Sequence, residues 1–74
     1  MSEFFRKALK EKGLKVTPQR VAIFEAITHL KNHPTAENII AYIKKNHPNI
    51  SVGTVYKVLD SFVENKLLSK VKTE

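Results

Sequence analysis

The segment from residue 51 to residue 63 constrains the fold most, because its apolar side chains recur at the spacing of one helix face. With Ser51 as the N-terminal cap, a helix here turns one apolar stripe toward a core, formed by Val52, Val55, Leu59 and Phe62. The other face opens with the small residues Gly53 and Thr54 and continues into Tyr56 and Lys57. Small residues let the first turn come close to another surface, and the tyrosine and lysine then reach across. We therefore predict an amphipathic helix with an outer face suited to close contact.

Two helices are predicted at the start of the chain. The first covers residues 2–12, and Gly13 supplies its stop signal. Its apolar face consists of Phe5, Ala8 and Leu9. The second begins with Thr17 as its cap and Pro18 at the first helical position, where the missing N–H costs nothing. It ends near residue 30, and its core positions are Val21, Phe24 and Ile27, with Ala22 and Ala26 allowing close helix contact.

A third helix follows the loop at residues 31–34. Thr35 is its predicted cap, and its buried stripe consists of Ala36, Ile39, Ile40 and Ile43. A short turn at residues 46–49 joins it to the helix at 51–63, as in helix-turn-helix units. Asn65 is predicted to end this last helix in a left-handed backbone conformation.

Residues 67–72 alternate in the manner of a strand. Three side chains point to one face and three to the other, namely Leu67, Ser69 and Val71 against Leu68, Lys70 and Lys72. A strand directly after the last helix predicts the first half of a β-wing. The predicted fold is therefore mainly α: a winged helix-turn-helix, with four helices followed by the first strand of a β-wing. We expect residues 1–74 to form one domain, because a chain of 74 residues holds one small core.

The charge balance favours a polyanionic partner such as nucleic acid. Lys and Arg outnumber Asp and Glu by 13 to 7, which gives a net charge of +6. A basic surface also serves solubility alone, so both interpretations stay open at this point. The chain has no cysteine, which excludes disulfides and thiolate metal sites in it. Its sequence has neither an apolar run long enough for a membrane span nor a signal-peptide pattern, so we expect a cytoplasmic protein.

The predicted outer face of the helix at 51–63 carries side chains that suit the major groove of DNA. Lys57 can donate to guanine O6 and N7 or to a phosphate. Tyr56 can pack on a thymine methyl group or hydrogen-bond a phosphate through its hydroxyl. Asp60 and Glu64 lie further along, so the helix is expected to dock by its N-terminal half. The alternative is a solvated face with one tyrosine partly in the core.

A second group of candidate contacts lies around the start of the second helix. Lys15 lies on an exposed connection and can reach a phosphate or an adjacent minor groove. Gln19 and Arg20 lie in the first helical turn, where backbone N–H groups favour a phosphate and Arg20 can add a bidentate clamp. The alternatives are an ordinary surface lysine at position 15 and a structural ion pair of Arg20 with Glu25 or Glu37.

Lys70 and Lys72 share one face of the predicted strand. They can lie along the backbone of a duplex, or they can protect the strand edge from pairing with another chain. The alternation of side chains does not separate these two roles.

The spacing of the histidines and the lack of catalytic motifs bear on which functions the sequence allows. No two of His29, His33 and His47 lie four residues apart within one predicted helix, and no carboxylate cluster accompanies them, so each is interpreted as a solvated histidine. The sequence lacks a glycine-rich phosphate loop, a pair of buried carboxylates and a nucleophile elbow. We therefore expect that the chain is not an enzyme.

Three sequence blocks stand out by their order and spacing: GLKVTPQR at 13–20, HPTAE at 33–37 and SVGTVYK at 51–57. Together they resemble the ferric uptake regulator (Fur) family of bacterial metal- and peroxide-responsive repressors, including its peroxide-sensing branch. The resemblance spans nearly the whole chain and implies a winged-helix DNA-binding domain. It also implies a C-terminal dimerisation and metal-binding domain that is absent from this chain, so a DNA-binding fragment is expected.

The resemblance implies roles for single residues. Tyr56 matches a tyrosine that meets bases in the major groove, and Lys15 matches a basic residue that reaches into the minor groove. Lys57 stands where many members carry arginine, and a lysine lacks the bidentate fork of that side chain. His33 matches a histidine of the regulatory metal site, a ligand only in the complete protein. That protein is expected to bind a divalent metal such as Fe, Mn or Zn, and this chain alone no cofactor.

Pattern and resemblance together predict sequence-specific DNA binding by a metal- or peroxide-responsive repressor. The expected partner is double-stranded DNA with an A·T-rich palindromic operator. The complete protein is expected to be a homodimer, and this chain a monomer or a domain-swapped oligomer. The alternative function is a winged-helix protein-interaction or oligomerisation module without autonomous DNA binding. The candidate DNA-binding residues are Lys15, Thr17, Gln19, Arg20, Ser51, Gly53, Thr54, Tyr56, Lys57, Lys70 and Lys72.

Overall fold

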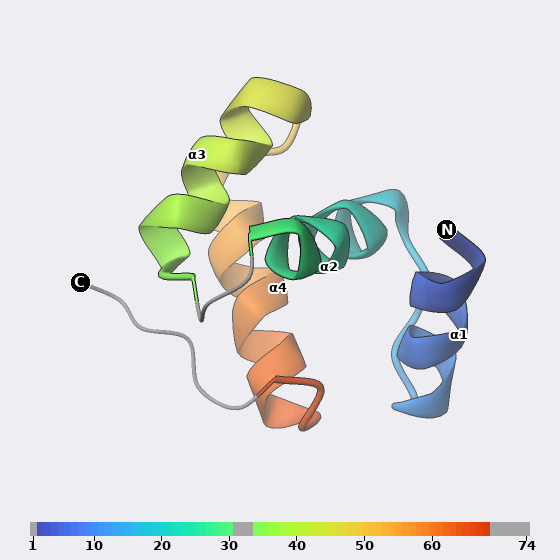
Figure 1. Ribbon diagram of the computed structural model, residues 1–74. Coiled ribbons are helices and arrows are strands. Elements are labelled where there is room, and N and C mark those ends of the chain that lie inside the picture. The colour runs from blue at the N-terminus through green and yellow to red at the C-terminus, as the bar shows by residue number, and fades with distance from the viewer. Residues whose placement is uncertain (1, 31–33, 69–74) are drawn as a thin grey trace.

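Four helices make up the part of the chain that the computed structural model describes, residues 2–30 and 34–68. They are α1 (Ser2–Glu11), α2 (Pro18–Leu30), α3 (Ala36–Asn46) and α4 (Val52–Glu64). α2 contacts each of the other three helices, and α3 and α4 also contact each other. Figure 1 shows α1 and α3 on opposite sides of α2. The four predicted helices are thus confirmed, and their packing centres on α2.

Hydroxyl side chains fix the starts of α2, α3 and α4, as the sequence predicts. Each hydroxyl accepts a hydrogen bond from the backbone N–H three residues later, at 3.2 Å for Thr17, 3.1 Å for Thr35 and 3.2 Å for Ser51. At the start of α3 the side-chain oxygen of Asn38 also accepts from the Thr35 N–H at 3.1 Å, which completes a capping box. These bonds satisfy N–H groups that a helix start leaves without partners. The helix starts therefore follow from local sequence.

α1 and α4 end in the same motif, in which one residue adopts a left-handed backbone conformation. Gly13 does so after α1, with φ of 77°, and Lys66 does so after α4, with φ of 62°. In each case the next residue donates to a carbonyl five residues back, at 3.0 Å after Gly13 and 2.8 Å after Lys66. The stop predicted at Gly13 is confirmed. The left-handed conformation predicted for Asn65 is wrong: its φ is −95°, and its side-chain amide donates to a carbonyl of the last helical turn at 2.8 Å.

The core takes side chains from all four helices, and no polar or charged side chain of the described residues is buried in it. Most of the predicted stripes are buried: Phe5, Leu9, Ala22, Phe24, Ala26, Ala36, Ile39, Ile43, Val55, Leu59 and Phe62. Val21, Ile27 and Ile40 are half-buried and pack against this core.

Three positions differ from the predicted stripes. Ile23 and Val58 are buried although the stripes omit them. Ile23 lies on α2, which is contacted from three sides and so buries more than one stripe. Val52 is wrongly predicted as buried, because it is 39 % exposed. The buried face of α4 begins with Val55, and Val52 lies one turn earlier, at the first position of the helix.

A chain of aromatic rings links α1, α2 and α4. The ring centroid of Phe24 on α2 lies 5.1 Å from that of Phe5 on α1 and 5.8 Å from that of Phe62 on α4. Both pairs meet edge to face, an arrangement that aromatic quadrupoles favour. Phe4 stands at the outer end of the chain, 6.5 Å from Phe24 and 65 % exposed. Within the described part, α1 contacts no helix other than α2, so these rings connect it to the rest of the core.

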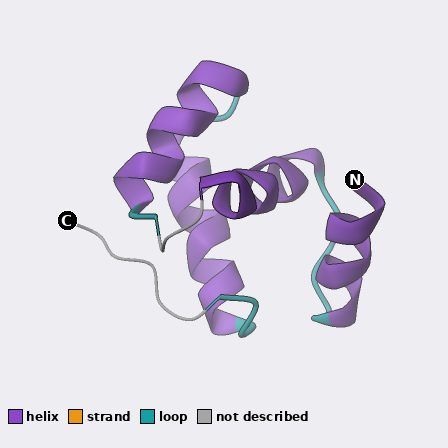
Figure 2. Ribbon diagram, in the orientation of Figure 1, coloured by secondary structure: helices purple, strands orange, loops and turns teal. Residues whose placement is uncertain are grey.

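The predicted wing strand falls mostly outside the described residues. Its first two positions, Leu67 and Leu68, form a bend and pack against the core, and residues 69–72 lie beyond the described range. Figure 2 shows the described residues, 2–30 and 34–68, as helices and short loops. None of these helices is long and apolar enough to cross a membrane.

Candidate nucleic-acid interface

The outer face of α4 carries the candidate base-contacting side chains. Tyr56 is 42 % exposed and Lys57 is exposed, whereas Val55 on the other face is buried. Asp60 and Glu64 are exposed in the second half of the helix. The cation therefore lies in the N-terminal half and the carboxylates in the C-terminal half. This distribution of charge lets a polyanion approach the first two turns of α4 more closely than the last.

Apart from Val52, the residues at the start of α4 are small or polar. The Ser51 hydroxyl accepts from the Thr54 N–H and lies 3.0 Å from the Thr54 hydroxyl, so both groups take part in capping the helix. Gly53 is exposed, and a methyl group added at its Cα would meet no atom closer than 4.0 Å. Glycine at position 53 is therefore not required by the packing of the chain itself. Its small size leaves open surface at the helix start.

Arg20 secures the connection that carries Lys15. Its Nη1 donates to the Lys15 carbonyl oxygen at 3.0 Å, and its backbone N–H donates to the Thr17 hydroxyl. Its Nε is buried and has no hydrogen-bond partner within the described part of the chain. The Lys15 side chain is exposed. The guanidinium thus supports a backbone loop, a role that the sequence analysis did not assign to it, and its predicted phosphate contact stays a prediction.

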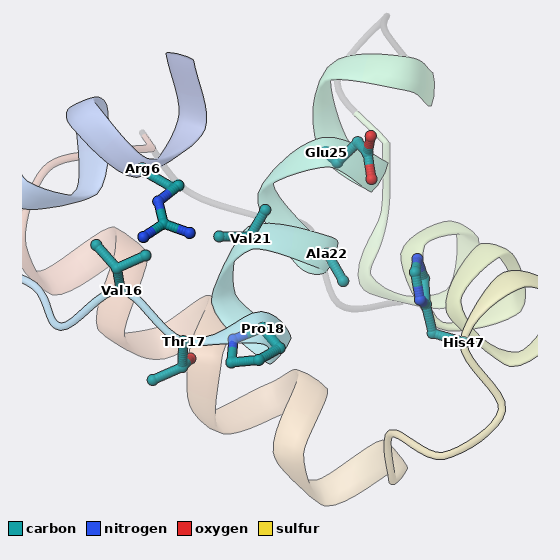
Figure 3. A pocket seen from close by; sticks show the side chains of 8 residues that line it. All are labelled: Arg6, Val16, Thr17, Pro18, Val21, Ala22, Glu25 and His47. Atoms are coloured by element: carbon teal, nitrogen blue, oxygen red, sulfur yellow. The ribbon is translucent and has the colours of Figure 1, made fainter. Parts of the chain in front are cut away.

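Two adjoining hollows run along the first half of α2. One has a volume of about 360 Å³, and Figure 3 shows Arg6 reaching into it from α1 toward Val16 and Val21. The other, of about 430 Å³, lies between the start of α2 and the turn that joins α3 to α4. The two share Pro18, Ala22 and His47 in their walls. The polar residues that line the second hollow are Gln19, Asn46, His47 and Asn49. Their side chains carry N–H groups of the kind that phosphate oxygens accept hydrogen bonds from.

The second hollow shows which candidate residues the fold brings together. Pro18 and Gln19 of α2 line it opposite Asn49 and Ile50, which directly precede Ser51. The starts of α2 and α4 are therefore neighbouring parts of one surface. His33, Lys70 and Lys72 lie outside the described residues, so their predicted roles stay predictions.

Some residues of this surface escape the sequence analysis. Asn46, His47 and Asn49 are predicted as turn residues, and His47 also as a solvated histidine, although three hydrogen-bonding side chains within four residues are a signal for contact. Val52 is assigned to the core because its spacing fits the stripe. Helical periodicity does not show where along a helix the covering elements begin, so the exposure of Val52 requires the structure.

The histidines of the described residues do not form a metal centre. The ring of His29 is exposed and lies 5.0 Å from the ring of Tyr42. His47 is half-buried in the wall of both hollows. Within residues 2–30 and 34–68 no group of three or more His, Cys, Asp or Glu side chains is placed to hold a metal ion. The described side chains therefore do not form a metal site by themselves.

Known proteins resemble this chain over most of its length. Residues 11–74 match the model of the ferric uptake regulator family. The peroxide operon regulator of Bacillus subtilis (strain 168) is 42 % identical over 65 residues, which are 88 % of this chain and 45 % of that relative. The peroxide-responsive repressor PerR of Staphylococcus aureus (strain Mu50) is 40 % identical over 55 residues, 74 % of this chain and 37 % of that relative.

A solved structure confirms the fold class. The structure of GAS PerR-Zn-Zn matches with a TM-score of 0.75 at 32 % sequence identity, over 99 % of this chain and 46 % of that chain. The chain thus spans less than half the length of each of these relatives. The predicted winged helix-turn-helix class is confirmed by this match and by the four helices, while the wing strand stays a prediction.

Proposed function

The chain belongs to the ferric uptake regulator family, and from this premise we propose that it is the DNA-binding part of a transcriptional repressor. The proposal treats residues 1–74 as one winged-helix domain. The observation that carries it is the outer face of α4, where Tyr56 and Lys57 project from a helix whose opposite face is buried. A net charge of +6 supports a polyanionic partner.

The proposed mechanism begins with α4. Its N-terminal half enters the major groove, where Tyr56 packs on a base and Lys57 donates to guanine or to a phosphate. Gly53 keeps the first turn small enough for close approach. Asp60 and Glu64 lie further along the same side of α4 as Lys57 and keep the C-terminal half of the helix away from the phosphates, because like charges repel.

The start of α2 supports this docking from the side. The backbone N–H and the side chain of Gln19 face a phosphate, because Pro18 has no N–H and the N–H groups of Arg20 and Val21 are bonded to the capping Thr17. Lys15 reaches into the adjacent minor groove from the loop that Arg20 holds by its carbonyl. Ser51 and Thr54 contribute hydroxyl groups at the start of α4, and Lys70 and Lys72 are proposed to lie along the backbone beyond it.

Further properties are proposed for the complete protein. It binds an A·T-rich palindromic operator as a homodimer, in the cytoplasm, in response to a divalent metal or a peroxide. His33 is one ligand of that metal, and the remaining ligands come from the C-terminal domain. The names of the relatives support the response to a peroxide or a metal: one is a peroxide operon regulator, another a peroxide-responsive repressor, and the solved structure is that of PerR-Zn-Zn. This chain alone is proposed to occupy one half-site as a monomer.

The test is a fluorescence-anisotropy titration of the chain with two duplexes of equal length, an A·T-rich inverted repeat and a G·C-rich sequence. Tyr56→Ala is expected to lower the difference in binding free energy between the two duplexes by about 1–3 kcal/mol, since a base contact discriminates between sequences by that amount. Equal losses on both duplexes would instead make Tyr56 a phosphate contact.

A charge-matched pair of variants separates the site from the net charge. Lys57→Ala and Lys10→Ala each remove one exposed cation, the first from α4 and the second from α1. The proposal expects a clear loss of affinity for Lys57→Ala and a small loss for Lys10→Ala. Equally small losses of affinity in the two variants would show that the binding is non-specific electrostatic attraction, and would contradict docking through α4.

One observation favours a second candidate, a winged-helix protein-interaction or oligomerisation module. Phe4 is 65 % exposed beside the aromatic chain of the core, and an exposed large apolar side chain can mark a contact surface. Light scattering tests it directly. A concentration-dependent dimer that Phe4→Ala abolishes, together with no DNA binding at low salt, would favour this candidate over the first.

A further inference from the structure

Two large apolar side chains are exposed next to each other at the start of α4. Val52 is 39 % exposed and Tyr56 is 42 % exposed. They lie four residues apart in one helix, so they are neighbours on the same side of its surface. Phe4, on α1, is the remaining exposed large apolar residue of the described part. The apolar pair is thus a local feature of α4 and not part of a generally apolar surface.

The fold gives no reason for a valine at this position. Ser51 supplies the helix cap, through its hydroxyl, and the core of α4 begins at Val55. β-branched residues are among the weaker helix formers, so valine in the first turn does not favour the helix either. A single exposed apolar residue is ordinary, but this one lies one turn before Tyr56 on the same side of α4.

The chemistry of the valine side chain restricts what it can contact in a DNA complex. Its methyl groups neither donate nor accept hydrogen bonds, so it gains nothing against a phosphate. The C5-methyl of thymine is the apolar group that the major groove presents, and residues at the start of a recognition helix are the ones that reach base edges. Methyl packing against methyl is the contact that remains.

We propose that Val52 is a specificity-determining residue, which packs against the C5-methyl group of a thymine near the base that Tyr56 contacts. This inference rests on the proposed function, because it requires α4 to enter the major groove. Four residues of helix rise by about 6 Å, and neighbouring base pairs are about 3.4 Å apart. The thymine read by Val52 therefore lies about two base pairs from the one read by Tyr56.

The expected effect of one methyl contact is modest but measurable. Burying one methyl-sized group stabilises a complex by an amount that corresponds to about a fourfold change in Kd. Removal of the thymine methyl should therefore weaken binding about fourfold, and shortening of the Val52 side chain should do the same. Making both changes weakens it by little more than one change alone, because both remove the same contact.

A uracil scan tests this contact. The probe is an A·T-rich inverted-repeat duplex selected from a randomised pool by binding to the chain itself. Each thymine is replaced in turn by deoxyuridine, which removes the C5-methyl and leaves base pairing unchanged. Anisotropy titrations compare the wild-type chain, Val52→Ala, Val52→Thr and the control Phe4→Ala, which shortens an exposed apolar side chain on α1. Circular dichroism confirms that each variant keeps its helices.

The inference predicts that one thymine position loses its sensitivity to uracil in Val52→Ala and keeps it in Phe4→Ala. Val52→Thr, which exchanges one methyl for a hydroxyl, gives a smaller loss of sensitivity at that same position. If Val52→Ala shows the same uracil profile as the wild type while both bind the duplex, the inference is overturned and the proposed function stands. If the wild-type chain selects no duplex even at low salt, the proposed function fails and the inference fails with it.

Discussion

Residues 13 and 66 occupy the same backbone conformation after α1 and after α4, but one is a glycine and the other a lysine. Both have positive φ, 77° at Gly13 and 62° at Lys66. A side chain in this region places Cβ too close to the following carbonyl, which costs roughly 1–2 kcal/mol, and glycine avoids this cost. Adding a Cβ at position 13 should therefore destabilise the fold, and removing the Cβ at position 66 should stabilise it.

The magnitude follows from the backbone alone. A Cβ added at Gly13 would meet no atom within 4 Å, so Gly13→Ala introduces conformational strain without a steric clash. We expect Gly13→Ala to lower the free energy of unfolding by about 1 kcal/mol and Lys66→Gly to raise it by about 1 kcal/mol. In a domain of this size, each change shifts Tm by about 4–8 °C in the corresponding direction.

The assay is thermal unfolding followed by circular dichroism, with urea titration as a second measure of the free energy of unfolding. Lys66→Ala is the matched control, because it removes the charge and keeps the Cβ. It should leave stability within about 0.5 kcal/mol of the wild type. A Lys66→Gly variant that is no more stable than Lys66→Ala would refute the argument from backbone conformation.

Two further changes test the core and the recognition face. Phe24→Ala breaks the aromatic chain between Phe5 and Phe62 and should cost about 3–5 kcal/mol in urea unfolding; a loss below 1 kcal/mol would show that α1 is held by other contacts. Lys57→Arg restores a planar fork and should tighten binding to duplexes with guanine in the contacted step by about 1–3 kcal/mol. An equal gain on duplexes without that guanine would mean that residue 57 contacts only phosphate.

Local chemistry explains how much of the fold could be predicted. The caps at Thr17, Thr35 and Ser51 act within one helical turn, so their positions in the sequence are sufficient to set the helix starts. The stop at Gly13 is equally local, since glycine has the conformational freedom that the motif requires. Asn65 was a weaker indication, because its amide can bond back to the helix and leave the left-handed conformation to the next residue.

Properties that depend on neighbours could not be predicted in this way. The stripe on α4 included Val52 because periodicity alone does not show where α2 and α3 stop covering the helix. Arg20 has two predicted roles, both with charged partners, and no pattern marks the Lys15 carbonyl that its guanidinium contacts in the structure. The sequence predicts the contact residues of α2 and α4 as two separate groups. Only the fold shows that Gln19 lies beside the turn that precedes Ser51.

The proposed interface with double-stranded DNA is the outer face of α4 together with the start of α2. The most direct measurement is the affinity for the A·T-rich inverted repeat at several salt concentrations, by fluorescence anisotropy. With about 3–5 phosphate contacts, the plot of log affinity against log salt should have a slope of about −3 to −4. Lys57→Ala should make this slope shallower by about one where Lys57 contacts a phosphate, and should instead weaken the preference for guanine where it contacts a base. Absence of binding even at low salt, or a Lys57→Ala variant that changes neither the slope nor the sequence preference, would contradict docking through α4.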